Sequence, residues 1–357
     1  MTRAAGQDGV ATAARRSEVD ARLGIVREIA ARRGSGAVAL SWRRNFAWLT
    51  AGGESHIVLS SDSGVATLVV TPSQAVAVTQ NIEAARLADE ELGGLGIEPV
   101  AVPWWEATAI DREVARRTGG TAASDADIET ELSAARSILS TFDQERLAAI
   151  GADAGAAVAG ALDAVVDGIT ELQLAAALQA RLPTARVPVL LVAADERIAR
   201  YRHPLPKDVP IRRRVMLVVV AERWGLHVAM TRFRELEPPS GSIAAATDAV
   251  RSVERALHDA TRPGATLGEV FGAGQAAYRA VGQADAWRDH HQGGTIAYQG
   301  RERVATPGDE TVVRPGMAFA WNPSLPGVKT EDTFILGDDG ARRYVTTVEP
   351  PPEGALG

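Results

Sequence analysis

The sequence predicts a mixed α/β protein of two domains. Three observations support this fold class: a length of 357 residues, a balance of 46% apolar and 23% charged residues, and an alternation of helix-like and strand-like patterns along the chain. At roughly 150 residues per domain, the length is enough for two domains that each bury a core. The composition is typical of folded globular chains and not of disordered chains or coiled coils.

Charge and cysteine content exclude several classes of protein. The 38 basic and 45 acidic residues give a net charge of −7, so a nucleic-acid or membrane partner is not expected. The absence of Cys excludes disulfides, Cys-ligated metal centres and thiol nucleophiles. The longest clearly apolar run, residues 215–221, is far shorter than the roughly 18 residues of a membrane-spanning helix. We therefore expect a cytoplasmic protein with a small-molecule substrate.

The first domain is expected over residues 17–140. Residues 1–16 are rich in Ala, Gly and charge without an apolar signal-peptide core, so we expect a disordered tail there. Apolar residues at helical spacing predict a first helix over residues 17–33. Strands are then expected at 37–40, 65–70 and 75–79, with a hairpin turn at 71–74, and helices at 82–92 and 110–117.

The second domain is expected over residues 141–348, before a tail of residues 349–357. It contains an internal repeat, because Thr170 precedes Gln173 and Thr266 precedes Glu269 at the spacing of a helix capping box. Each of these helices follows a long helix and precedes strands. The strands are expected at 187–193, 215–221 and 226–233 in the first half, and at 290–298, 318–322 and 330–336 in the second.

Five short segments of the second domain resemble the creatinase/aminopeptidase family. They are residues 200–204, 225–232, 290–294, 315–323 and 327–333. The resemblance implies a pita-bread fold with an internal pseudo-twofold repeat, preceded by a creatinase-type α/β domain. It also implies a homodimer in which the first domain partly closes the partner's cleft.

The metal-dependent members of this family hold two metal ions with five side chains, of which this sequence keeps two. The two Asp positions hold Val218 and Ala229, one Glu position holds Asn322, and His291 and Glu331 remain. Two divalent ions held close together need several anionic oxygens to offset their repulsion. We therefore expect the dinuclear site to be absent and predict no metal cofactor.

His203 is the candidate general acid and base, with Glu331 as its partner and His291 as the third catalytic candidate. The resemblance implies this role, because creatinase also lacks the metal ligands and has its proton-transfer His at this position. A neutral imidazole can take a proton from water and return it to a leaving nitrogen. The alternatives are an exposed loop residue at His203, or a single ion held by His203, His227, His291 and Glu331.

Three further residues are candidates for substrate contact. Strand alternation places His227 and Thr231 on the same face as Ala229. Asn322 offers both a donor and an acceptor to an amide or carboxyl group. Thr231 stands where creatinase has an acid that grips its cationic substrate, so creatine itself is not the expected substrate.

Two neighbouring segments are expected to lie outside the cleft. On a strand, the adjacent His290 and His291 would point to opposite sides, so His290 is expected to be a hydrogen-bonded flank. Arg301 and Glu302 follow a Gly-containing turn and are expected on the surface.

Residues 42–48 of the first domain combine aromatic and basic side chains. Arg43, Arg44 and Trp48 are therefore candidate substrate contacts in a lid. The alternative is a strand that buries Phe46 and Trp48 and leaves both Arg side chains in solvent.

The resulting hypothesis is a metal-independent, creatinase-like hydrolase that cleaves a C–N bond of an amide, amidine or related group in a small molecule. The first alternative is a catalytically inactive pita-bread binding or scaffold protein. The second is a metal-dependent Xaa-Pro aminopeptidase, which the missing ligands disfavour.

Overall fold

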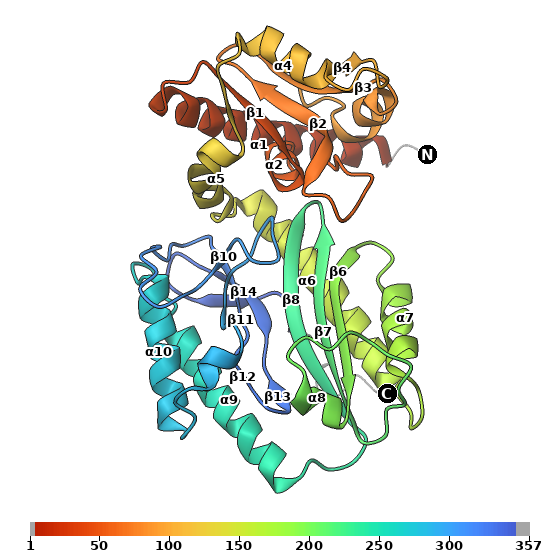
Figure 1. The fold of residues 1–357 in the computed structure, drawn as a ribbon, viewed down its shortest axis with the longest axis vertical. Helices are drawn as coiled ribbons and strands as arrows, with labels where there is room; N and C mark the ends of the chain where they lie inside the picture. The colour runs from red at the N-terminus through yellow and green to blue at the C-terminus, as the bar shows by residue number, and fades with distance from the viewer. Residues whose placement is uncertain (1–3, 348–357) are drawn as a thin grey trace. The chain divides into compact units, whose positions relative to one another are not determined.

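The computed structural model describes residues 4–347, and their side chains from residue 13 onward. The chain divides into two compact units, Met1–Arg136 and Ser137–Gly357, each of which combines helices with β-sheet (Figure 1). The division falls four residues before the expected limit at residue 140. The expected tail at 349–357 lies outside the described residues.

The first unit is built on a five-stranded sheet in the order β4-β3-β2-β1-β5. Helices α1 and α4 pack against this sheet, and the turn at residues 71–74 joins β2 and β3 as expected. The elements are α1 (Ala4–Arg32), β1 (Ala37–Trp42), α2 (Arg43–Leu49), β2 (Ser63–Val70), β3 (Ala75–Gln80), α3 (Ala84–Arg86) with a π-helical turn at Leu87–Glu91, β4 (Glu98–Val102), α4 (Ala109–Thr118), β5 (Ala122–Ser124), a 3₁₀ turn at Ala126–Ile128 and α5 (Glu129–Arg136).

The expected disordered tail at residues 1–16 is wrong over residues 4–16, because α1 already begins at Ala4. This stretch is rich in Ala, which has the highest helix propensity. Its end is also anchored in the unit, since the Arg15 guanidinium donates to the carbonyls of Thr50 at 3.0 Å and Glu91 at 2.7 Å. These long-range contacts are not visible in a local pattern.

The second unit contains two similar halves, each with two helices followed by strands (Figure 1). The first half comprises α6 (Thr141–Asp163), α7 (Glu171–Arg181), β6 (Arg186–Ala194), α8 (Glu196–Arg200), β7 (Arg214–Arg223) and β8 (Leu226–Glu235). The second comprises α9 (Gly241–Ala260), α10 (Leu267–Ala280), a 3₁₀ turn at Ala286–Asp289, β9 (Gly293–Thr295), β10 (Arg303–Val304), β11 (Ala318–Trp321), β12 (Ser324–Leu325), β13 (Val328–Lys329), β14 (Asp332–Leu336) and β15 (Arg342–Tyr344).

The strands of the second unit form one sheet in each half and a short hairpin. The first sheet has the order β6-β7-β8, the second has the order β10-β9-β11-β14-β15, and β12 pairs with β13. An isolated bridge between Thr231 of β8 and Glu331 joins the two halves. The strand expected over 290–298 is shorter than predicted, because only Gly293–Thr295 enters the ladder.

Apolar side chains of α9, α10 and the second sheet form the core beside this junction. The largest are Phe271, Tyr278, Phe319, Trp321 and Phe334. The Trp321 indole N–H donates to the Thr261 hydroxyl at 3.0 Å, which satisfies its buried donor. Among residues 4–347, no helix is long and apolar enough to cross a membrane.

Both expected capping boxes are present, at Thr170 with Gln173 and at Thr266 with Glu269. The Thr266 hydroxyl accepts from the Glu269 N–H at 3.2 Å, and the Glu269 carboxylate accepts from the Thr266 N–H at 2.8 Å. We expect Thr266→Ala to lower the free energy of unfolding by about 1 kcal/mol, measured by urea denaturation. Thr266→Ser keeps the oxygen and is the matched control. Equal stability of Thr266→Ala and the parent would contradict this role.

Candidate active site

A buried carboxylate lies where the two halves of the second unit meet. Glu331 is 3% exposed and sits between β13 and β14. Its side chain accepts from the Thr231 hydroxyl at 2.8 Å, from Arg301 Nη2 at 2.5 Å and from Lys329 Nζ at 2.9 Å. We call Glu331, Arg301 and Lys329 the ion cluster.

The ion cluster carries one positive charge in excess, because two cations face one carboxylate (+2 − 1 = +1). Burial alone would raise the pKa of Glu331, but the charges of Lys329 and Arg301 and the hydrogen bonds from Lys329 and Thr231 together lower it to about 2. The carboxylate is therefore ionised at neutral pH. The Arg301 and Lys329 side chains both point at this carboxylate and pair with it.

Three imidazoles lie together near the ion cluster. His203 is in the loop after α8, and His290 and His291 precede β9. One ring nitrogen of each lies within 4.8 Å of one nitrogen of the other two, and the His203 and His290 Nε2 atoms are 2.9 Å apart. We call these residues the histidine trio.

Neighbouring contacts hold the two segments of the trio in place. The Arg202 guanidinium pairs with the Asp289 carboxylate at 3.1 Å, which ties the His203 loop to the segment before His290. The Gln292 amide donates to the His290 carbonyl at 2.6 Å and accepts from the Tyr278 hydroxyl at 2.9 Å. The position of His290 therefore depends on its buried hydrogen bond with Gln292, which Tyr278 holds in turn, and the position of His203 depends on the loop after α8.

The histidine trio is uncharged at neutral pH. Burial, and secondly the Lys329 charge, lower the pKa of His290 to about 3. Burial, and secondly the Arg301 charge, lower the pKa of His291 to about 4. The pKa of His203 is lowered by burial and by Lys329, although Glu331 acts in the opposite direction. Each imidazole therefore offers a lone pair rather than a positive charge.

The structure corrects two expectations about this segment. His290 and His291 do not point to opposite sides, because their rings are stacked with centroids 4.4 Å apart and the strand begins only at Gly293. Arg301 is not a surface residue, because its side chain reaches the buried Glu331. Lys329 is a further residue of the site that the sequence did not single out, and it lies outside the strand expected over residues 330–336. Its Nζ is 2.9 Å from the Glu331 carboxylate.

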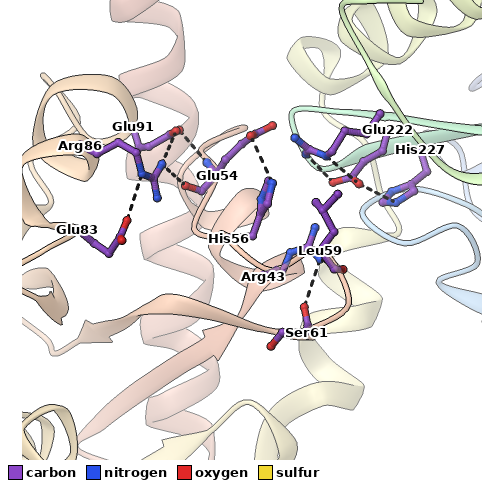
Figure 2. Close-up of polar contacts among 11 residues, drawn as sticks. Arg43, Glu54, His56, Leu59, Ser61, Glu83, Arg86, Glu91, Glu222 and His227 are labelled. Carbon is purple, nitrogen blue, oxygen red and sulfur yellow. Dashed lines mark hydrogen bonds and ion pairs between the residues drawn. The ribbon is translucent and has the colours of Figure 1, made fainter. Parts of the chain in front are cut away.

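The expectation that His227 shares a pocket with Thr231 is wrong. His227 Nδ1 lies 3.3 Å from the Ala297 carbonyl, and His227 Nε2 lies 4.0 Å from the Glu222 carboxylate (Figure 2). Four residues of strand separate the two side chains by about 13 Å, so sharing a face of β8 does not bring them together. Asn322 is buried, and its Oδ1 has no hydrogen-bond partner in the part of the chain that the structure describes.

The aromatic and basic segment of the first unit forms helix α2 and not a strand or an extended lid. Trp48 is 2% exposed and lies in the core of its unit, so it does not present a surface to a ligand there. Arg43 donates to the Leu59 carbonyl at 2.8 Å (Figure 2). The Arg44 guanidinium stacks 3.9 Å from the centre of the Trp42 ring and pairs with Glu129. These contacts stabilise the unit itself.

Residues 145–342 match the profile of metallopeptidase family M24. The chain belongs to this family. Among curated relatives, the probable dipeptidase PepE of Mycobacterium tuberculosis is 29% identical over 124 residues, which cover 33% of this chain and 32% of the relative. The alignment thus spans about a third of the length of the curated relatives that the chain matches.

Solved structures of low sequence identity share the fold. The dipeptidase PepE from Mycobacterium ulcerans aligns with a TM-score of 0.75 at 20% identity, over 94% of this chain and 97% of that one. The Xaa-Pro dipeptidase from Bacillus anthracis aligns with a TM-score of 0.76 at 16% identity, over 93% and 99%. The N-terminal domain of the FACT complex subunit SPT16 from chickpea aligns with a TM-score of 0.71 at 13% identity, over 94% and 97%. The pita-bread fold expected from the sequence is confirmed.

These comparisons contradict the expectation of a metal-independent, creatinase-like hydrolase. The family is one of metallopeptidases, and the named relatives are dipeptidases, including an Xaa-Pro dipeptidase. Peptidases are hydrolases of C–N bonds, so the general reaction class agrees with the expectation. The comparisons favour the peptidase alternative instead of a creatinase-like reaction.

The residues at the five M24 ligand positions do not fit a pair of metal ions. Val218 and Ala229 are buried and apolar, so neither can replace an Asp. Asn322 carries no charge, and the Glu331 carboxylate is already bound by Lys329 and Arg301. An M24 dinuclear centre therefore lacks both its oxygen ligands and the negative charge that would hold it.

Proposed function

We propose that this M24 chain hydrolyses the peptide bond of dipeptides or other short peptides, including Xaa-Pro peptides, beside the histidine trio. The observation that carries the proposal is the meeting of three uncharged imidazoles with the ion cluster at the junction of the two halves. The names of the relatives support the substrate class. The homodimer implied by the resemblance stays a prediction.

His203 is the side chain best suited to exchange protons with a substrate. His203 and His291 are exposed, whereas His290 is buried, and His203 has the further support of its place on a loop rather than beside a strand. An exposed neutral imidazole can accept a proton from water and return it to the amine that leaves. His290 Nε2, 2.9 Å away, orients the His203 ring.

The positive charge of the ion cluster is suited to the C-terminal carboxylate of a dipeptide. The excess positive charge of the ion cluster favours a carboxylate over an ammonium group. The unpartnered Asn322 Oδ1 is available to accept from an amide or amine N–H. A cavity of about 600 Å³ reaches Thr231, Lys329 and Glu331 from the side of α9, within the usual size range for small-ligand sites.

A dipeptide panel tests the proposal. Purified protein should release free amino acids from at least one dipeptide, and His203→Ala should lower kcat/KM by at least about 10²-fold, the usual effect of losing a general acid and base. Arg288→Ala is the matched control, because Arg288 is in the same segment but pairs with Asp285 at the surface. Unchanged activity in His203→Ala, with a fold verified by circular dichroism, would assign proton transfer elsewhere.

A binding function without cleavage is the second candidate. It is favoured by the replacement of charged ligands at Val218, Ala229 and Asn322, and by the same fold in a subunit of a protein complex. Calorimetry that detects peptide binding, together with no product after prolonged incubation with the full panel, would favour this candidate over hydrolysis.

A further inference from the structure

We propose that His203, His290 and His291 form a mononuclear site for zinc or a similar divalent transition metal. This inference rests on the proposed function and concerns the same site, but it gives His203 a different part, because a ring nitrogen that binds an ion does not also accept a proton from water. Its test below is a binding measurement, so it can fail or succeed independently of peptide cleavage. The site would use only one of the five M24 ligand positions, that of His291.

The geometry of the trio suits a four-coordinate ion. Bonds of about 2.0–2.1 Å in a tetrahedral site place the ligand nitrogens about 3.3 Å apart. The His203 and His290 Nε2 atoms are 2.9 Å apart, and the available nitrogens of all three rings lie within 4.8 Å of one another. The stacked rings of His290 and His291 would have to rotate for their nitrogens to point at one ion.

One ring nitrogen of the trio lacks a hydrogen-bond partner. His290 is 9% exposed, and its Nδ1 has no partner among the residues that the structure describes. Its Nε2 faces the His203 Nε2, a contact that two neutral rings satisfy when one nitrogen carries the proton and the other accepts it. An ion between these two nitrogens would replace that shared proton.

Neighbouring residues also position the segments that carry the three imidazoles before any ion binds. The Arg202–Asp289 pair connects the two segments, although the Asp289 side chain is 60% exposed, and the buried Gln292 amide holds the His290 carbonyl. Ligands that neighbouring groups hold in place lose little freedom when an ion binds. Three His ligands with a fourth position open are typical of catalytic zinc, which lowers the pKa of bound water to about 7.

The ion cluster sets the expected affinity. Lys329 and Arg301 carry positive charge near the trio, and both oppose the charge of a bound cation. Glu331 compensates for only one of them. We therefore expect weaker binding than in a zinc site surrounded by carboxylates, and tighter binding after Lys329→Met, which removes one cation and leaves Glu331 with Arg301 and Thr231.

Calorimetry with zinc, and visible absorption of bound Co²⁺, test the inference on full-length protein stripped with a chelator. The parent should bind about one equivalent, and His290→Ala and His203→Ala should each weaken binding by at least about 10²-fold. His227→Gln is the matched control and should bind like the parent, which separates the trio from the ion set that includes His227. Lys329→Met should bind about tenfold more tightly.

The outcomes separate the two proposals. Stoichiometric binding that depends on the trio supports the site even when no dipeptide is cleaved, in which case only the proposed function falls. The site is overturned if the folded parent binds no zinc or cobalt at about 1 mM, or if His290→Ala binds as well as the parent.

Discussion

Glu331→Gln is expected to lower the free energy of unfolding by about 3–5 kcal/mol at neutral pH, as measured by urea denaturation. The substitution removes the charge of a buried carboxylate and leaves Lys329 and Arg301 facing a neutral amide. Breaking a buried ion pair by removing one partner costs more than the pair contributes, because the remaining charge stays desolvated. Here two charges remain, and they repel each other.

The pH dependence of this effect has a definite direction. The folded-state pKa of Glu331 is lowered to about 2 from an ordinary value of 4.5. The stability that its ionisation provides is therefore fully present above the ordinary pKa and is lost as the pH falls through the folded-state pKa. The difference between parent and Glu331→Gln should be constant from about pH 8 to 5 and should shrink below about pH 4.5.

A double variant is the control for this prediction. Adding Lys329→Met to Glu331→Gln removes one of the two uncompensated cations and should restore part of the lost stability. A loss below about 1 kcal/mol in Glu331→Gln, or no recovery in the double variant, would show that water already solvates these charges.

Gly293→Ala is expected to lower the free energy of unfolding by about 3 kcal/mol or more. Gly293 has a φ of +97°, which L-residues rarely adopt. A Cβ there would lie 2.1 Å from the Ala320 carbonyl oxygen and 2.8 Å from Trp321 Cα, both backbone atoms of the paired strand. The cost of the strained backbone and the cost of overpacking add to each other. Strand β11 cannot move away without disturbing the second sheet.

Gly272→Ala is the matched control, to be compared by thermal and urea unfolding. Gly272 is an exposed position in α10, and apart from its chain neighbours and the helix's own backbone, no described residue lies within 4 Å of the added Cβ. Ala is favoured over Gly in a helix by about 0.5–1 kcal/mol, so this variant should be as stable as the parent or more so. A Gly293→Ala protein as stable as Gly272→Ala would contradict the close approach of β9 to β11.

Local sequence patterns predicted the helices and strands that are determined by residues close together in the chain. The apolar runs that became β6, β7 and β8 lie within one or two residues of their expected limits, and both capping boxes formed. The start of α1 was missed, because the contacts of Arg15 that anchor it lie 35 and 76 residues away along the chain. Periodicity contains no information about such contacts.

The sequence alone shows which metal ligands have been replaced. It does not show which new side-chain contacts form in their place. Val218, Ala229 and Asn322 are visible in the sequence as unsuitable ligands. The pairing of Arg301 with Glu331 spans 30 residues and arises only when β9 and β14 enter the same sheet. The interpretation of His290 depended on a strand that does not form at that residue.

The contact between His203 and His290 and the pair of Arg202 with Asp289 both span 87 residues and connect the two halves of the repeat. Neither half contains the site by itself. Closing a loop of this length costs chain entropy before any contact compensates for it, and such non-local contacts form slowly. Helices and sheets can therefore be regained during refolding before the trio assembles, and the acquisition of ligand binding would lag behind the recovery of secondary structure.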